Sequence, residues 1–249
     1  MAIDFALQKS CAARRHTPEV KLRSMVRHSD NAEVAIAQFR EKFPYADNET
    51  LTAKCTVEIA VKRPDGTVIQ TQVTIGRLQD MIAPLSGLDS ECKGCPANVS
   101  GRSFGCIGKL DTPMRKEAED WLLARLPDDA KDATLVQLLH YLADHGIDGA
   151  PVEELRSRSR IFERKEAAVR KWGGWFGAKT QITSSQLLQM LAFNEDIHPE
   201  QAQLYTRLLG LSRLGGDAGS ASPAVEQIRN LLRAVNLAGR LDAKLAVEA

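Results

Sequence analysis

Apolar and polar residues alternate most regularly between residues 52 and 76, and this alternation predicts a β-hairpin. In the first half of the segment every second residue is apolar: Cys55, Val57, Ile59 and Val61. Such a pattern turns one apolar face inward and one polar face outward. Residues 63–66, with the sequence Arg-Pro-Asp-Gly, predict a turn before a second strand over 67–75, because proline presets φ and glycine accepts a positive φ. An isolated hairpin is marginally stable, so we expect a helix or another strand to cover its apolar side.

Apolar positions spaced three and four residues apart predict helices in most of the remaining chain. A weaker helical pattern begins after Pro18 and is interrupted at 29–31, and residues 151–171 form a charged helical segment. The stronger helices are expected at about 112–126, 131–145, from Ser184 or Ser185 to Leu191, 199–214 and 223–247. The sequence therefore predicts a predominantly helical α+β protein, with one β-hairpin module that carries a cysteine-rich loop and one helical module.

Turn residues and changes in composition divide the chain into five expected segments. Gly, Ser and Asp concentrate after Leu214, which is typical of a flexible linker. The expected segments are an N-terminal helical, partly flexible segment (1–50), a hairpin and Cys-loop metal module (51–127), a helical module (128–213), a linker (214–222) and a C-terminal helix (223–249).

The composition excludes several classes of protein. The chain has 249 residues, of which 43% are hydrophobic, so it has enough apolar residues to build a core. No apolar run approaches the roughly 18 residues of a membrane span, and we expect no transmembrane segment and no secretory signal. The 33 basic and 32 acidic residues nearly balance. Phosphate-binding glycine loops, the nucleophile elbow of hydrolases and the His-Glu-x-x-His zinc motif are absent from the sequence.

The most informative segment contains three of the five cysteines. Cys92, Cys95 and Cys106 follow the pattern C-x2-C-x10-C. Two thiols separated by two residues can face one ion across a tight turn, which Gly94 favours, and neighbouring glycines allow backbone amides to approach the sulfur atoms. Few cysteines, clustered in this way, are typical of a reducing compartment, so we expect a cytoplasmic protein with a metal site.

The spacing of the cysteines is compatible with more than one metal and does not identify a fourth ligand. A zinc site needs four ligands, and Cys55, His140 or His145 would have to complete it. Cys55 also fits the apolar strand face, where a cysteine packs as a small hydrophobic residue. Three cysteines alone could hold an iron–sulfur cluster with one open iron. A redox-active thiol pair and ordinary loop thiols are the remaining interpretations.

These observations favour a metal-containing interaction or regulatory protein with a structural cysteine site, whose cofactor is zinc or an iron–sulfur cluster. The alternative is an iron–sulfur redox enzyme or electron carrier. The apolar stripe of the C-terminal helix either docks back or binds a protein partner. Residues 151–179 contain eight basic and four acidic residues beside Trp172, Trp175 and Phe176, which suits a nucleic-acid accessory protein or a membrane surface. We favour a solvated helix with local ion pairs and packed tryptophans for that segment.

Overall fold

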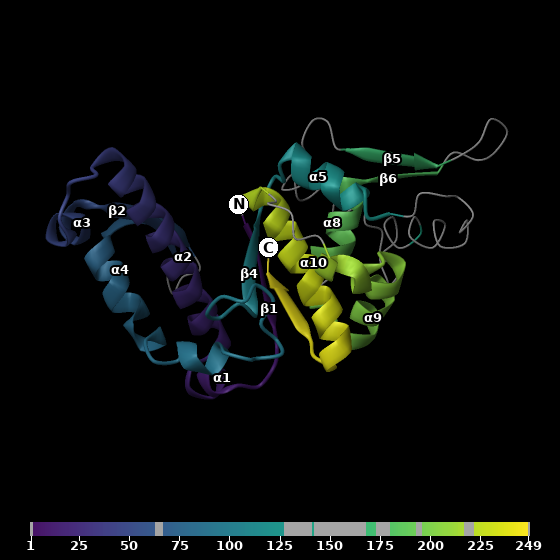
Figure 1. Cartoon of the computed structure of the whole chain (residues 1–249), viewed down its shortest axis with the longest axis horizontal. Helices are drawn as coiled ribbons and strands as arrows, with labels where there is room; N and C mark the ends of the chain where they lie inside the picture. Colours follow the sequence, from purple (N-terminus) through teal and green to yellow (C-terminus); the bar gives the residue numbers. More distant parts are fainter. Residues whose placement is uncertain are drawn as a thin grey trace. The chain divides into compact units, whose positions relative to one another are not determined.

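The computed structural model describes residues 2–62, 67–126, 141, 168–172, 180–192, 196–216 and 222–248. Within these ranges the protein has a predominantly helical α+β fold with small antiparallel sheets. The chain divides into two compact units (Figure 1). Unit 1 contains Met1–Lys9 and Pro96–Ala249, and unit 2 contains Ser10–Cys95. Unit 2 is therefore an insertion, in sequence, after the first strand of unit 1.

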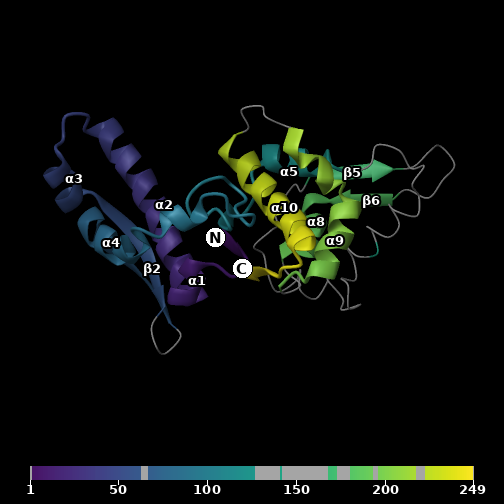
Figure 2. The same cartoon turned by 60° about the horizontal axis from the view of Figure 1, so that its bottom comes forward.

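Unit 2 is organised around the predicted hairpin. Strands β2 (Thr56–Lys62) and β3 (Val68–Thr74) pair antiparallel, with Thr56 opposite Thr74. Helices α2 (Glu19–Lys42), α3 (Asn48–Lys54) and α4 (Ile75–Ile82) pack with them (Figure 2). The buried core consists of Ala32, Leu51, Cys55, Ile59, Val73, Ile75 and Leu78, with Ala35, Ile36 and Phe39 of α2 against it. The expected hairpin and its helical cover are both confirmed.

Helix α2 is continuous, and the predicted interruption at 29–31 is wrong. Met25 and Ala32 are both buried on the face that packs inward, whereas residues 29–31 are partly exposed. Polar residues on the outer face of a helix are compatible with a continuous helix when the inner face stays apolar. The shorter elements of unit 2 are α1 (Ala12–His16), η1 (Ala83–Leu85) and η2 (Asp89–Cys92).

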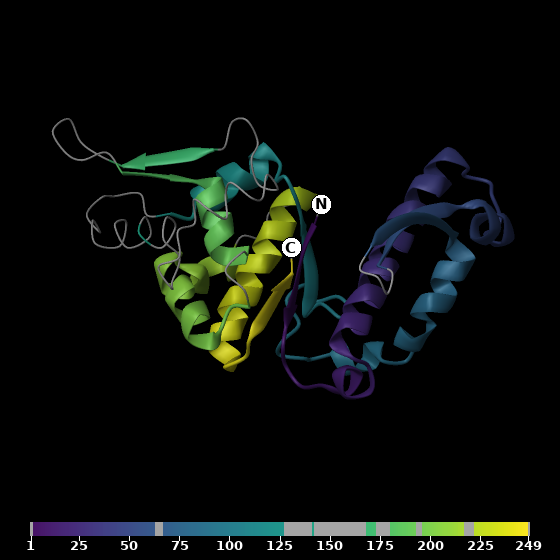
Figure 3. The same cartoon turned by 180° about the vertical axis from the view of Figure 1, so that it is seen from behind.

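Unit 1 contains a three-stranded antiparallel sheet in the order β4-β1-β7 (Figure 3). The central strand β1 (Ala2–Leu7) pairs with β4 (Ile107–Asp111) on one side and β7 (Leu245–Glu248) on the other. Two sequence expectations are corrected here. Residues 2–7 form a strand although segment 1–50 was expected to be helical or flexible, and the C-terminal helix ends before residue 247 because Asp242 takes a left-handed φ of 49°.

Helix α10 (Pro223–Leu241) packs against β4, β1 and helix α9 (Pro199–Leu208). Its inward face is fully buried: Ile228, Leu231, Leu232, Ala234, Val235 and Ala238. A Cβ atom on Gly239 would lie 3.0 Å from the backbone nitrogen of Gln203, so glycine permits the close approach of the two helices. The C-terminal helix therefore docks back onto its own chain, which was one of the two expected outcomes.

Helix α5 (Lys116–Leu123) begins later than the expected start at Thr112–Pro113. Strand β4 extends to Asp111, and Arg115 is still extended as the N-cap residue, so the helix starts only at Lys116. The expected inward stripe is nevertheless buried at four positions: Met114, Ala118, Leu122 and Leu126. Trp121, which was expected in the same stripe, is partly exposed.

The remaining described elements are β5 (Val169–Trp172), β6 (Thr180–Thr183), α8 (Ser184–Ala192) and η4 (Leu211–Gly216). Strand β5 corrects the expected helix over 151–171 at its C-terminal end, because β5 pairs antiparallel with β6. Helix α8 confirms the expected helix. Its cap is Thr183 rather than a serine, since the Gln186 amide donates to Thr183 Oγ1 (3.1 Å).

Four expectations concern residues that lie wholly or mostly outside the described part of the chain. They are the turn at 63–66, nearly all of the helix expected at 131–145, most of the helix expected at 151–171 and the centre of the linker expected at 214–222. The helix expected at 199–214 is α9, which ends at Leu208. The turn at 209–210, where Gly210 has a φ of +60°, separates α9 from η4.

Candidate metal-binding segment

Cys92 and Cys95 flank a tight turn in unit 2. Cys92 ends the 3-10 helix η2, and Gly94 has a φ of +70°, a conformation that glycine adopts without strain. The Cys95 amide donates a hydrogen bond to the Cys92 carbonyl oxygen at 3.3 Å. Both cysteines are partly exposed. The tight turn expected from Gly94 is therefore present.

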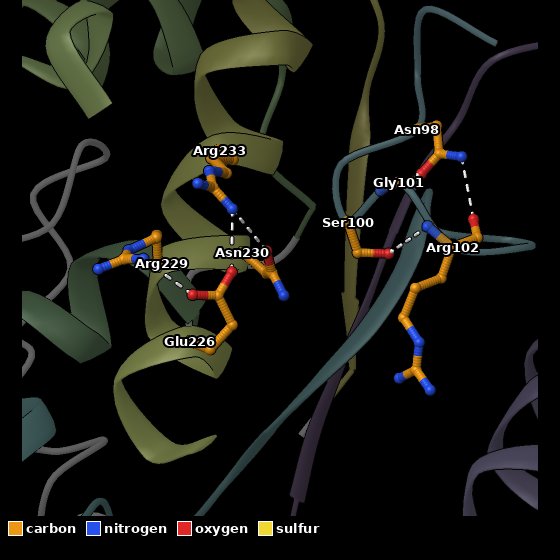
Figure 4. A network of polar contacts seen from close by, with 8 residues as sticks. All are labelled: Asn98, Ser100, Gly101, Arg102, Glu226, Arg229, Asn230 and Arg233. Atoms are coloured by element: carbon orange, nitrogen blue, oxygen red, sulfur yellow. Dashed lines mark hydrogen bonds and ion pairs between the residues drawn. The ribbon is translucent and has the colours of Figure 1, made fainter. Parts of the chain in front are cut away.

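The loop that follows is held by the side chain of Asn98. Asn98 Oδ1 accepts from the Gly101 amide (2.8 Å), and its Nδ2 donates to the Arg102 carbonyl oxygen (2.9 Å; Figure 4). The Arg102 amide donates to Ser100 Oγ at 3.4 Å. A Cβ atom on Gly105 would overlap both Asn98 Oδ1 and Ser100 Oγ, so a larger residue here would displace the side chains that hold the loop. Asn98 was not among the residues predicted from the sequence, although asparagine side chains commonly bond to the backbone of nearby turns.

Cys106 directly precedes β4 in unit 1. Its carbonyl oxygen accepts a hydrogen bond from the Leu7 amide at 2.9 Å, which anchors its backbone beside the central strand β1. The Cys106 side chain is partly exposed, as are those of Cys92 and Cys95. No disulfide joins any of the five cysteines, all of which lie in the described part of the chain.

Cys55 has a different environment from the three clustered cysteines. It is 6% exposed, and its Sγ donates to the Ala35 carbonyl oxygen at 3.6 Å. Burial raises the pKa of the Cys55 thiol above its usual value of 9.0. A metal ligand must be a thiolate, and this site favours the neutral thiol. The environment supports the packing interpretation of Cys55 over its expected role as a ligand.

The structure places the predicted ligands in both units. Cys92 and Cys95 belong to unit 2, Cys106 belongs to unit 1, and the boundary falls between Cys95 and Pro96. Within the described ranges, no three or more His, Cys, Asp or Glu side chains are grouped as they would be around a metal ion. His140 and His145 lie outside those ranges. The metal site therefore stays a prediction from the spacing of the cysteines and from the turn at Gly94.

The predicted basic segment 151–179 is described only at residues 168–172. Arg170 donates to the Leu123 carbonyl oxygen (3.3 Å), and its guanidinium carbon lies 5.7 Å from the centre of the Trp172 ring. Trp172 is only 6% exposed, which confirms the packed interpretation for this tryptophan. Trp175 and Phe176 lie outside the described residues.

Helix α10 carries a polar network beside its buried stripe, and Arg229 of this network is itself only 6% exposed. Glu226 pairs with Arg229 and Arg233, both at 3.0 Å (Figure 4). The guanidinium carbons of Arg229 and Arg125 lie 5.5 and 4.8 Å from the ring centre of Trp121. The contact between Arg229 and Trp121 joins α10 to α5, whereas the ion pairs of Glu226 lie within α10. The protein partner expected through the C-terminal helix would have to contact polar residues of α10, because its apolar face is buried.

No protein-family model, curated protein or solved structure shows a significant match to this chain. Among the helices that the structure describes, none combines the length and the apolar character needed to cross a membrane.

Proposed function

We propose that this chain is a metal-containing interaction or regulatory protein with a structural site at Cys92, Cys95 and Cys106. The observation that carries the proposal is the turn at Gly94, whose left-handed φ of +70° and 3.3 Å hydrogen bond bring two partly exposed cysteines to the two sides of one turn. This is the local arrangement that two thiolate ligands of one metal require.

The backbone on either side of the cysteines supports this proposal. The Asn98 hydrogen bonds order the loop that leads to Cys106, and the Leu7 amide fixes the Cys106 carbonyl group. Ordered ligands lose less conformational entropy when a metal binds. The role that we propose for the metal is to hold residues 92–106 in one conformation, so that the exposed side chains of Lys93 and Arg102 are presented to a protein partner.

Zinc would need one further ligand besides the three cysteines. Cys55 is a poor candidate because its thiol is buried, neutral and bonded to Ala35. His140, His145 or a water molecule is the better fourth ligand. When bound, zinc in such a site supplies folding free energy rather than catalysis, because the ligands cannot be arranged in this way in the unfolded chain.

An iron–sulfur cluster is the second candidate, and the position of Cys55 favours it over a four-cysteine zinc site. With Cys55 in the core, three cysteines remain, and three thiolates can hold a cluster that leaves one iron open. Cys92, Cys95 and Cys106 would hold the cluster. It would supply one-electron chemistry, and the protein would then be a redox enzyme or electron carrier.

Metal analysis of the anaerobically purified protein tests both candidates. One zinc per chain and no visible absorption would support the structural zinc site, whereas iron, sulfide and absorption near about 400 nm would support the cluster. Cys95→Ser should lose the bound metal. Cys11→Ser is the matched control, because Cys11 is also partly exposed and lies outside the C-x2-C-x10-C segment.

The Cys55→Ser variant separates loss of metal from loss of stability. It places a hydroxyl in the apolar core of unit 2, so we expect a lower unfolding midpoint with full metal content. Protein that carries no metal after anaerobic purification and does not bind added Zn²⁺ would refute the proposal. Equal metal content in the Cys95→Ser, Cys11→Ser and parent proteins would refute it as well.

A further inference from the structure

A groove in unit 1 lies between helix α5 and strand β5, and it is independent of the cysteine segment. Its volume is about 480 Å³. Four charged residues line it, three of them basic: Lys116, Asp120, Arg170 and Lys171. The rest of the lining is aliphatic, from Leu123, Ala124, Ala168 and Val169. Lys116 and Arg170, which are 54 positions apart in the sequence, thus belong to one basic surface.

The three basic side chains differ in how they are held. Arg170 is fixed by its hydrogen bond to the Leu123 carbonyl oxygen and by its contact with the Trp172 ring. Lys171, the next residue of β5, has an exposed side chain. Lys116 is 73% exposed and pairs with Asp120 at 2.5 Å. An exposed pair of this kind contributes little stability, so an anionic ligand can take the place of Asp120 at modest cost.

Helix α5 has two other carboxylates, Glu117 and Glu119, and neither lines the groove. Glu119 is buried, at 2% exposure. Glu117 follows Lys116 in sequence, but its Oε1 accepts a hydrogen bond from Ser222 Oγ at 2.8 Å. Asp120 is therefore the one acidic side chain among the described lining residues. A groove with three cations and one carboxylate attracts an anion.

We propose that this groove binds the phosphate backbone of a nucleic acid without sequence preference. The groove is open, and a helix and a strand each contribute basic residues to it, which suits an extended anionic polymer. Two of them are exposed lysines, which act as flexible point charges on phosphates and do not read base edges. Trp172, the tryptophan next to these cations, is buried, so binding is electrostatic rather than through base stacking on this residue.

The salt dependence of binding tests this proposal quantitatively. Three phosphate contacts to a single strand predict a slope of about −2 in a plot of log K against log salt, which is about a 20-fold loss of affinity between about 50 and 200 mM salt. The measurement is fluorescence anisotropy of a labelled oligothymidylate with the full chain. Lys171→Gln should remove one contact and reduce this loss to about 7-fold.

Two further variants distinguish binding of the oligonucleotide in the groove from non-specific binding to charges elsewhere on the surface. Lys21→Gln changes an exposed lysine of α2 in unit 2 and should keep the 20-fold salt effect of the parent protein. Asp120→Asn removes the carboxylate of the groove and should tighten binding, an effect that loss of structure would not produce. Circular dichroism checks that each variant is folded.

Three results would overturn the proposal. The first is no binding of the oligonucleotide at low salt. The second is equal weakening by Lys171→Gln and Lys21→Gln, which would show that the groove is not the site. The third is salt-dependent binding to phosphatidylserine vesicles without binding to the oligonucleotide, which would assign the groove to a membrane surface instead.

Discussion

The contact between Phe5 and Gly108 allows a sharp test of the unit 1 sheet. These residues are opposite each other on β1 and β4. A Cβ atom at position 108 would lie 2.8 Å from Phe5 Cε2 and 3.1 Å from Cε1. Phe5 is 1% exposed, so its ring cannot move into solvent. We therefore predict that Gly108→Ala destabilises unit 1 through overpacking against the Phe5 ring.

The magnitude follows from two opposing effects. Overpacking a buried contact costs about 1–3 kcal/mol. Replacing glycine by alanine stabilises a compatible site by about 0.4–1 kcal/mol, because the unfolded chain loses conformational freedom. The net loss in the free energy of unfolding should be about 0–2.6 kcal/mol. In a Phe5→Leu background the ring is absent, and the same Gly108→Ala change should be neutral or slightly stabilising.

Urea unfolding of the four proteins in this double-mutant cycle measures the effect. We expect a coupling free energy of about 1–3 kcal/mol between positions 5 and 108. Gly76→Ala is a control, because its Cβ would lie at an ordinary 3.4 Å from the nearest atom, Thr52 O. The reasoning fails if Gly108→Ala is equally costly with Phe5 and with Leu at position 5, or if it stabilises the parent protein.

Three other predictions concern the helices and the pH dependence. Ser222→Ala should cost about 1 kcal/mol in urea unfolding, because Ser222 Oγ caps α10 at the Val225 amide (3.4 Å). Leu231→Ala should cost about 2–5 kcal/mol by the same measurement, since Leu231 is fully buried on α10. Burial, with a smaller effect of Arg27, lowers the pKa of His28 below 6.5, and burial raises the pKa of Cys55 above 9.0. Unit 2 should therefore lose stability as the pH falls through the lowered His28 pKa, and also as the pH rises through the raised Cys55 pKa. Urea unfolding midpoints measured between about pH 5 and 10 check this. In the Cys55→Ala variant, the decrease of the midpoint on the alkaline side should become smaller.

The elements of unit 2 were the more predictable part of the fold. The alternation around Ile59 is a local pattern, and a hairpin needs only neighbouring residues to pair. Strand β1 gave no such pattern because it is central in its sheet and buried on both faces: Ile3, Asp4, Phe5 and Ala6 are all less than 9% exposed. A strand that is buried on both sides does not alternate, and its partners β4 and β7 are distant in the sequence.

In the candidate sites, too, only features formed by neighbouring residues could be predicted from the sequence. The turn at Gly94 could be predicted because its residues are adjacent in the sequence. The surroundings of Cys55 could not, since its hydrogen bond to Ala35 depends on the packing of α2 against the hairpin. The basic groove was predicted only in part. Arg170 and Lys171 belong to the basic segment recognised from sequence, but Lys116 joins them through the tertiary contact between α5 and β5.

The central position of β1 has a consequence for biosynthesis. Leu7 pairs with Leu245, so the sheet cannot close until residues 245–248 have left the ribosome. Unit 2, with its own core and a continuous sequence from Ser10 to Cys95, has all of its residues available much earlier. During translation, the edge of the first strand that pairs with β7 therefore stays unpaired until the end of the described chain has been synthesised.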